Sequence, residues 1–235
     1  LFLKKEYDKV IAEAQALLKA NSRRPEVLTL LGLALLVKEQ VAEAEKEFRR
    51  AIEVDGTYAP ARRGLARVLV SSKKLEEAAE QYRAILAARP TSVMDLTGLG
   101  QRYALQGNLA QAVAQFEAAI RLAPGYPPLA LVLADLYLRV GRNTEAIAAA
   151  RDVIKAQPKL AAPHVTLGEA YVRTLRIPEA LAAFKEAVAL DPKQVMYQYR
   201  LAQLQASFGQ AAEARAALAK IAEANPQFVP AKIDL

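Results

Sequence analysis

The chain of 235 residues contains no cysteine and no tryptophan, and it has a single histidine, His164. Without cysteine it forms neither a disulfide bond nor a thiolate metal site, and this absence fits the cytosol and the periplasm equally well. Nucleophilic catalysis with a histidine base would depend on His164 alone. We expect that histidine to be packed or at a rim, and no cluster of His, Asp and Glu has the spacing of a metal site.

Long apolar runs and phosphate-binding loops are also missing. No apolar run approaches the roughly 20 residues needed to span a bilayer, because charged or polar residues interrupt every predicted helix. The segment Gly98-Leu99-Gly100 resembles a dinucleotide-binding loop, but it lies in the middle of a predicted helix with no βαβ unit around it. These absences predict a chain without a cofactor, a bound metal or catalytic residues.

The formal net charge of +7 is spread evenly along the chain. Residues 1–92 hold 17 basic and 13 acidic side chains, and the remainder holds 15 basic and 12 acidic ones. Nucleic-acid binding needs basic groups concentrated on one face. This even distribution therefore predicts that the chain does not bind nucleic acid.

What the sequence does contain is a repeating unit of 34 residues, seen most clearly in residues 93–126. Two amphipathic helical patterns fill this unit. Gly107 and Asn108 separate them and Pro124 ends the second, because proline cannot continue a helix. Each unit therefore predicts a helical hairpin. With Val93 as position 1, the six full repeats are residues 25–58, 59–92, 93–126, 127–160, 161–194 and 195–228.

Several repeat positions hold the same kind of residue throughout. Position 7 is leucine and position 20 is alanine in all six repeats, while position 32 is proline in five. We expect positions 7 and 24 to fill a seam between the two helices, and alanine at 20 to let them approach closely. Position 8 alternates between glycine and alanine, which predicts closer helix approach at Gly32, Gly100 and Gly168. The residues at position 24 are Phe48, Tyr82, Phe116, Ala150, Phe184 and Leu218.

A 34-residue unit with small residues at 8 and 20, aromatic residues at 11 and 24 and proline at 32 resembles the tetratricopeptide repeat (TPR). The resemblance covers essentially the whole chain and implies an all-α fold, a right-handed α-solenoid of tandem TPR helical hairpins. It further implies that first helices line a concave groove and second helices form the convex back. A weaker similarity, in composition only, links the chain to bacterial tandem-TPR proteins of envelope and exopolysaccharide secretion systems.

The two ends of the chain match incomplete repeats. Residues 1–24 fit the second helix of a truncated repeat, over Tyr7 to Lys19, followed by a linker, and residues 229–235 fit the start of another. We interpret residues 1–235 as a single TPR array cut from a longer protein, so the localisation stays open between the cytoplasm and the bacterial periplasm. We expect the final segment to be too short to cover repeat 6, leaving the seam formed by Leu201, Leu204 and Leu218 partly exposed. Self-association through the truncated ends is a further expectation.

By the resemblance, repeat positions 2, 5, 9, 12 and 13 line the groove. Chaperone-binding TPR proteins hold a terminal carboxylate with asparagine at position 9, and no repeat here has asparagine at that position. We therefore expect a non-catalytic protein-interaction scaffold whose groove binds a peptide or helix with an apolar residue beside an acidic one. The alternative is a self-assembling or accessory segment of a larger bacterial envelope or polysaccharide secretion protein. The predicted partner-binding residues are Leu33, Leu36, Val37, Arg63, Arg67, Met94, Thr97 and Gln101.

Two of these residues supply the charge. Arg63 and Arg67 lie four residues apart, and neither has an acidic residue one helical turn before it, so we expect an uncompensated positive patch. In repeats 4 and 5 the same spacing places an acid before the arginine and predicts internal ion pairs: Asp135 with Arg139, and Glu169 with Arg173.

Overall fold

The computed structural model describes residues 2–234, which form fourteen helices and contain no strand. The chain divides between Leu122 and Ala123 into two compact units, called unit 1 and unit 2 below. Unit 1 contains α1 (Phe2–Ala20), α2 (Pro25–Val37), α3 (Val41–Val54), α4 (Ala59–Ser71), α5 (Leu75–Ala88), α6 (Val93–Leu105) and α7 (Leu109–Leu122). Unit 2 contains α8 (Pro127–Arg139), α9 (Asn143–Ala156), α10 (Ala162–Arg173), α11 (Ile177–Leu190), α12 (Val195–Ser207), α13 (Ala211–Ala224) and α14 (Val229–Ile233).

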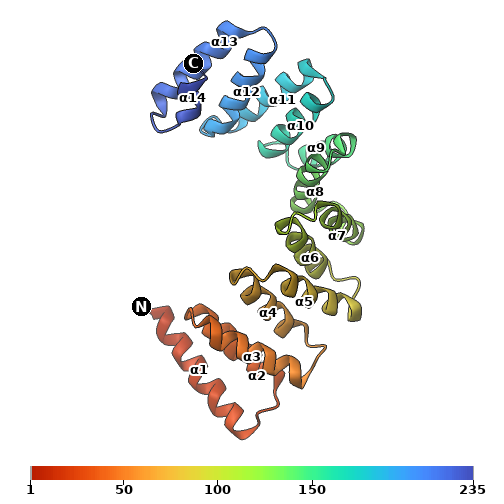
Figure 1. Ribbon diagram of the computed structural model, residues 1–235, viewed down its shortest axis with the longest axis vertical. Coiled ribbons are helices and arrows are strands. Elements are labelled where there is room, and N and C mark those ends of the chain that lie inside the picture. Colours follow the sequence, from red (N-terminus) through yellow and green to blue (C-terminus); the bar gives the residue numbers. More distant parts are fainter. Residues whose placement is uncertain (1, 235) are drawn as a thin grey trace. The chain divides into compact units, whose positions relative to one another are not determined.

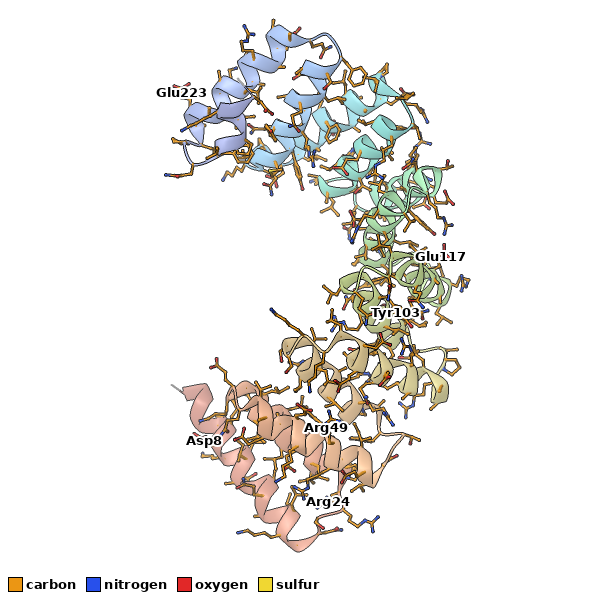
Figure 2. The ribbon with its side chains drawn as sticks, in the orientation of Figure 1. Asp8, Arg24, Arg49, Tyr103, Glu117 and Glu223 are labelled. Atoms are coloured by element: carbon orange, nitrogen blue, oxygen red, sulfur yellow. The ribbon has the colours of Figure 1, made fainter. Side chains whose placement is uncertain are left out.

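Each full repeat contains one pair of packed helices, from α2 and α3 in repeat 1 to α12 and α13 in repeat 6 (Figure 1). The prediction of an all-α solenoid of helical hairpins is therefore confirmed, whereas the assignment of residues 1–235 to one array stays a prediction. Helix α1 is longer than the segment predicted from the sequence and packs on α2. Asp8 of α1, labelled in Figure 2, accepts a hydrogen bond from Lys38 at 2.7 Å, beside the C-terminal end of α2.

Proline and glycine mark the helix ends as the sequence predicts. Pro178 lies in the first turn of α11, where the missing proline N–H would have no partner within the helix. In the turns between paired helices, Gly107, Gly141 and Gly209 have φ angles of 81°, 80° and 83°. Glycine adopts this left-handed conformation without strain, so the chain can reverse direction within a few residues.

The core of each repeat is built on alanine at position 20 and the large residue at position 24. All six position-20 alanines are buried, and so are all six residues at position 24. Leucine at position 7 is buried in repeats 1 to 4, but Leu167 and Leu201 are only half-buried. The predicted seam is therefore present in every repeat and is less completely covered in the last two.

Glycines on the first helices lie directly against these aromatic rings. A Cβ atom at Gly32 would approach the ring of Phe48 to 2.7 Å, and the corresponding distances are 2.9 Å for Gly100 to Phe116 and 2.8 Å for Gly168 to Phe184. At each of these three glycines the first helix thus lies directly against the ring of its own repeat. That helix separation alternates between odd and even repeats stays a prediction.

The same rings also contact the next repeat. A Cβ atom at Gly64, on the first helix of repeat 2, would overlap the ring of Phe48 from repeat 1. One at Gly98 would approach the ring of Tyr82 from repeat 2 to 2.5 Å. Phe48 is thus held between Gly32 and Gly64, and this contact places the first helix of repeat 2 against the hairpin of repeat 1.

The end of unit 2 differs from the expectation. Residues 229–233 form the short helix α14, and Ala231 is fully buried with Leu218 and Ile221 of α13. Leu204 and Leu218 are buried, so the prediction that the final segment leaves the seam partly exposed is wrong for these two residues, whereas Leu201 is half-buried as predicted. One turn of helix suffices because Phe228, just before it, packs edge-on against the ring of Tyr199, with the ring centroids 5.2 Å apart.

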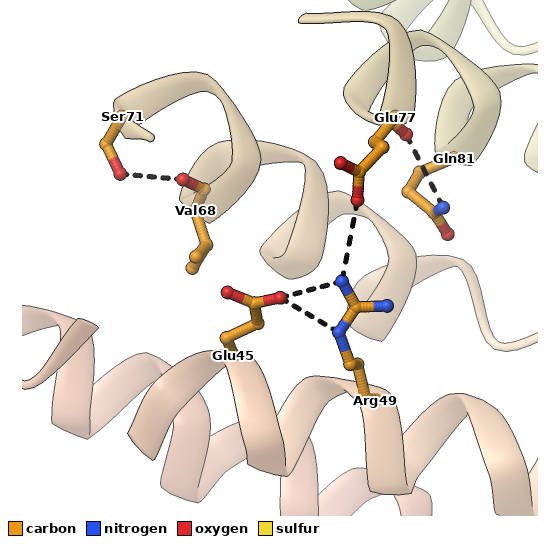
Figure 3. A network of polar contacts seen from close by, with 6 residues as sticks. All are labelled: Glu45, Arg49, Val68, Ser71, Glu77 and Gln81. Carbon is orange, nitrogen blue, oxygen red and sulfur yellow. Dashed lines mark hydrogen bonds and ion pairs between the residues drawn. The ribbon is translucent and has the colours of Figure 1, made fainter. Parts of the chain in front are cut away.

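Charged residues on the second helices of unit 1 pair with one another. Arg49 of α3 donates hydrogen bonds to Glu45 at 2.7 and 2.9 Å, and its guanidinium lies 3.7 Å from Glu77 of α5 (Figure 3). Arg83 of α5 donates to Glu76 at 2.8 Å. Such exposed pairs contribute at most about 1 kcal/mol each. They do show that these second-helix arginines already have partners within the chain.

The glycine and ring contact gives a direct test of the packing. We expect Gly64→Ala to lower the stability of unit 1, because overpacking costs about 1–3 kcal/mol and outweighs the roughly 1 kcal/mol that alanine gains over glycine in a helix. The control is Gly56→Ala, where the nearest atom to the new Cβ would be 3.9 Å away. The measurement is the unfolding midpoint in denaturant, and equal midpoints for the two variants would contradict the described packing.

Candidate partner-binding surface

The eight predicted partner-binding residues lie on the first helices of unit 1. Leu33, Leu36 and Val37 are on α2, Arg63 and Arg67 on α4, and Met94, Thr97 and Gln101 on α6. Helix α2 packs on α4, and a hydrogen-bonded side-chain pair joins α4 to α6. The structure therefore brings these three helices together, and we call the surface formed by the eight residues the first-helix face.

Apolar side chains are prominent on the first-helix face. Val37 is 52% exposed and Met94 is 65% exposed, and Leu33 is also exposed. Leu105, at the C-terminal end of α6, is 59% exposed. Leu36 and Thr97 are half-buried. Exposed apolar side chains that gather on one surface are characteristic of interaction sites.

Arg63 is not the uncompensated charge that the sequence predicted. Its Nε donates to Oδ1 of Asp95 at 2.6 Å and its Nη2 donates to Oδ2 at 2.7 Å, which is a bidentate ion pair between α4 and α6. The prediction failed because it searched for an acid one turn away on the same helix, whereas the partner lies 32 residues further along the chain. Arg63 is therefore a structural residue of the first-helix face.

Asp95 is fully buried and completely supplied with hydrogen bonds. Ser92, the N-cap of α6, donates its hydroxyl to Oδ2 at 2.5 Å, and the backbone N–H of Asp95 donates to the Ser92 hydroxyl oxygen at 3.3 Å. Burial raises the pKa of Asp95, but the hydrogen bonds from Arg63 and Ser92 outweigh this effect and hold the pKa below its ordinary value. The carboxylate is thus ionised and paired near neutral pH.

The sequence does single out Asp95 as an unusual residue when the same position is compared across the repeats. It stands at position 3, where every other repeat has an apolar or aromatic residue: Val27, Ala61, Leu129, Pro163 and Tyr197. A carboxylate at a position that is otherwise apolar or aromatic, and buried in four of the other five repeats, indicates a dedicated partner, because a buried unpaired charge is strongly destabilising. The spacing along one helix could not reveal which arginine that partner is.

Arg67 remains as a free charge on the first-helix face. It is exposed on α4, one helical turn after Arg63, and it forms no hydrogen bond or ion pair with any residue in the described range. Of the two predicted arginines, Arg67 alone is available to a partner. Gln101 is also exposed, and its side-chain oxygen accepts a long hydrogen bond of 3.5 Å from Arg102.

The predicted ion pairs of unit 2 are absent from residues 2–234. Asp135 does not pair with Arg139, and Glu169 does not pair with Arg173. Arg173 donates instead to the backbone carbonyl of Leu138 on α8. That carbonyl belongs to the last turn of α8, where carbonyl groups lack partners within the helix.

Unit 2 contains a hollow surface, which we call the α10–α12 groove. Its volume is about 690 Å³. Both apolar and charged residues line it: Val172, Phe184, Leu204, Phe208 and Leu218, with Glu169, Arg173, Arg200 and Asp234. Phe208 is half-exposed at this groove. Glu169, Val172 and Arg173 occupy groove positions by the sequence resemblance, but the predicted site residues do not include this part of the chain.

Neither a metal-binding cluster nor a membrane-spanning helix is found among the described residues. They contain no group of three or more His, Asp or Glu side chains that could hold a metal ion. His164 is half-buried, and its Nε2 is buried without a hydrogen-bond partner, in keeping with the expected packed histidine. Burial lowers the pKa of His164. Among residues 2–234, no helix combines the length and apolar character needed to cross a membrane.

Comparison with known families gives a consistent result. Two family models, both for the tetratricopeptide repeat, match this chain, one over residues 35–95 and 103–166 and the other over residues 6–60 and 165–227. Together these segments include nearly all of the six repeats. No curated protein sequence matches the chain.

Solved structures show the same fold. The chain is similar to the C-terminal part of a TPR repeat-containing protein from Cytophaga hutchinsonii, with a TM-score of 0.80 and 16% identity, over 100% of this chain and 97% of that one. It is similar to YrrB, a TPR protein with an unusual peptide-binding site, with a TM-score of 0.72 and 17% identity, over 80% of this chain and 96% of that one. For MamA from Desulfovibrio magneticus RS-1 the TM-score is 0.68 and the identity 21%, over 72% and 97% of the two chains.

The buried ion pair of the first-helix face can be tested by removing its charge. We expect Asp95→Asn to lower the stability of unit 1 by about 1–3 kcal/mol, because Arg63 loses its charged acceptor. The control is Asp135→Asn, which removes an exposed carboxylate that has no partner in the described residues, and its expected effect is within about 0.5 kcal/mol. Denaturant unfolding measures both, and an equal loss in the two variants would show that the Arg63 pair adds nothing.

The same pair predicts a dependence of stability on pH. Because the pKa of Asp95 is lowered from 3.8 in the folded chain, its contribution is complete above the unfolded pKa and is lost as the pH falls towards the folded pKa. We therefore expect the stability difference between the wild type and Asp95→Asn to be constant above about pH 5 and to shrink below about pH 4. Unfolding curves recorded between those values and about pH 3 provide the measurement, and a difference that persists unchanged at the lowest pH would contradict the lowered pKa.

Proposed function

Because the chain belongs to the tetratricopeptide repeat family, we propose that it is a non-catalytic scaffold that holds a peptide or helix of a partner protein on the first-helix face of unit 1. Stacked repeats of this kind present extended surfaces that proteins use for binding. The similarity to YrrB, whose structure has a peptide-binding site, supports the proposal. The location of the site rests on the residues of the face themselves.

The observation that carries this proposal is the exposure of large apolar side chains around one free cation. Val37 and Met94 are each more than half exposed on helices whose other faces are buried, and Arg67 lies on the helix between them. Covering a valine or methionine side chain contributes up to about 1.5–3 kcal/mol. A partner gains this energy only if it presents apolar groups of its own.

The positive charge of the first-helix face indicates that the partner also has an acidic residue. Arg63 is occupied by Asp95, so Arg67 is the arginine that we expect to meet an acidic residue. Charge-assisted hydrogen bonds are stronger than neutral ones and favour one register of the bound segment. The proposed partner is therefore a segment in which an apolar side chain lies near an aspartate or glutamate.

The α10–α12 groove is a second candidate surface. Its volume of about 690 Å³ and the apolar residues in its lining suit one or two large side chains of a bound segment. Its charged groups are balanced, with Glu169 and Asp234 beside Arg173 and Arg200. It therefore gives no preference for an acidic partner, which distinguishes it from the first-helix face.

Self-assembly is the alternative function. Leu17 of α1 and Leu30 of α2 are about half exposed, which supports contacts between copies at this end of the chain. The last helices of unit 2 offer less, because α14 covers Leu218 and Ile221. Light scattering over a range of concentrations distinguishes a monomeric scaffold from a self-assembling segment.

The two methionines of the chain allow each surface to be observed separately. Met94 belongs to the first-helix face of unit 1, and Met196 is exposed on α12 of unit 2. We expect a peptide selected from a phage library of random 16-residue sequences to shift the ¹³C-methyl NMR signal of Met94 and to leave Met196 unchanged. A shift of Met196 alone would place binding on unit 2, and the absence of any selected peptide would show that the scaffold proposal is wrong.

A matched pair of substitutions then tests the apolar contact. Val37→Ser removes an exposed apolar side chain from the first-helix face, and Leu122→Ser removes one at the end of α7, on a second helix. We expect Val37→Ser to weaken binding of the selected peptide about tenfold, or about 1.4 kcal/mol, and Leu122→Ser to have no effect. Equal affinities for the two variants would place the contact elsewhere.

A further inference from the structure

Arg102 occupies a position that is apolar in every other repeat. The residues at position 10 are Ala34, Val68, Arg102, Leu136, Ala170 and Leu204, and all except Arg102 are buried. Arg102 is half-buried, and its Nε is fully buried without any hydrogen-bond partner. Its one hydrogen bond is the long contact of 3.5 Å from Nη2 to Gln101. A guanidinium in this state destabilises the free protein.

Tyr82 is the second unusual residue in the same place. Three other repeats have phenylalanine at position 24, so Tyr82 differs from them by one hydroxyl group. The edge of its ring that carries the hydroxyl contacts Gly98, one helical turn before Arg102 on α6. The Tyr82 hydroxyl has no hydrogen-bond partner among the described residues. A buried tyrosine usually finds such a partner, so this hydroxyl is available to a ligand.

Three arginines of unit 1 act electrostatically on the hydroxyl of Tyr82. Burial raises the pKa of Tyr82, while the positive charge of Arg102 acts in the opposite direction. Arg63 and Arg67 act in the same direction as Arg102. Among the described residues, Asp95 is the one acid that acts on the pKa of Tyr82, and both of its oxygens are already bound to Arg63. Arg67 and Arg102 therefore remain as two cations without an acid.

This situation differs from the second-helix side of unit 1. There Arg49 has Glu45 and Glu77 as partners (Figure 3), and Arg83 donates both to Glu76 and to the hydroxyl of Tyr103, which Figure 2 labels. Arginines that serve packing are thus satisfied within the chain. Arg67 and Arg102, on the first-helix side, are not.

We propose that Arg67, Arg102 and the hydroxyl of Tyr82 form a receptor for one aspartate or glutamate side chain of the bound partner segment. This inference rests on the proposed function and assigns the recognition of the acidic residue to named groups. A carboxylate accepts several hydrogen bonds at once, and arginine supplies donors in a planar arrangement that suits it. The Tyr82 hydroxyl donates a further hydrogen bond to the same group.

The apolar surroundings indicate a side-chain carboxylate in preference to a chain terminus. Leu33 and Val37 are exposed on α2, which packs on the helix of Arg67, and Leu105 is exposed at the C-terminal end of the helix of Arg102. A segment that covers the apolar side chains of both α2 and α6 must continue past the carboxylate that the receptor binds. Its acidic residue is therefore internal, with apolar residues on either side.

The experiment uses peptides selected from the 16-residue phage library on the wild-type chain. We expect them to contain an aspartate or glutamate flanked by apolar residues, and we expect the corresponding asparagine or glutamine peptide to bind at least tenfold more weakly. Against Arg102→Leu or Arg67→Gln, the acidic and amide peptides should bind within about twofold of each other. Tyr82→Phe, which restores the residue of the other repeats, should weaken only the acidic peptide.

Stability provides a readout that a merely structural role would not produce. Arg102→Leu introduces the residue found at position 10 in repeats 4 and 6, so we expect its thermal midpoint to rise by about 2–4 °C. The control is Arg139→Leu, an exposed arginine of unit 2 without a partner in the described range, which should change neither stability nor peptide preference. A lower midpoint for Arg102→Leu together with an unchanged preference for the acidic peptide would overturn the proposal.

The outcomes also separate this proposal from the scaffold function. Peptides that shift the Met94 methyl signal but carry no acidic residue would overturn the carboxylate receptor and leave the binding surface in place. The absence of any peptide that shifts the Met94 signal would overturn both. An acidic preference that survives in the Arg67→Gln and Arg102→Leu variants would assign recognition to other groups and overturn the receptor alone.

Discussion

The structure of unit 1 depends on a ring held between two first helices. Phe48 fills the space between Gly32 of its own repeat and Gly64 of the next, and Tyr82 makes the second of these contacts with Gly98. Because each ring touches both hairpins, it sets the distance between successive repeats. The part of each first helix that takes no part in this packing is free to carry residues that bind a partner. The proposed receptor uses one group of the packed rings as well, the hydroxyl of Tyr82.

The repeat pattern predicted this architecture correctly because the same helix–helix contacts recur in every repeat. The positions of the helices, the buried alanines at position 20 and the proline at the start of α11 could all be inferred from the 34-residue register. The end of unit 2 could not, because α14 is stabilised by a contact between Phe228 and Tyr199 that the register does not contain. The 34-residue pattern therefore predicts the contacts that recur in every repeat. It does not predict a contact that occurs only once, such as that between Phe228 and Tyr199.

The ion pairs of the chain were also predicted poorly from the sequence pattern. Spacing along one helix suggested that Arg63 was free and that Asp135 and Glu169 were paired, and the structure shows otherwise. A long side chain on one repeat reaches the neighbouring repeat as easily as the next turn of its own helix. Comparing the same position across repeats is more informative, since it singles out both Asp95 and Arg102 as charged residues in apolar columns.

The contacts of Phe48 and Tyr82 also limit how the repeats of unit 1 could be rearranged. Each of these rings lies against a glycine at position 6 of the next repeat, Gly64 and Gly98, where a side chain would require the ring to shift. Repeat 1 has Leu30 at this position. Repeats 1 and 2 are therefore not equivalent as neighbours of a ring packed in this way, although they share one fold. A hairpin of unit 1 that is transplanted into another array keeps this contact only if the following repeat has glycine at position 6.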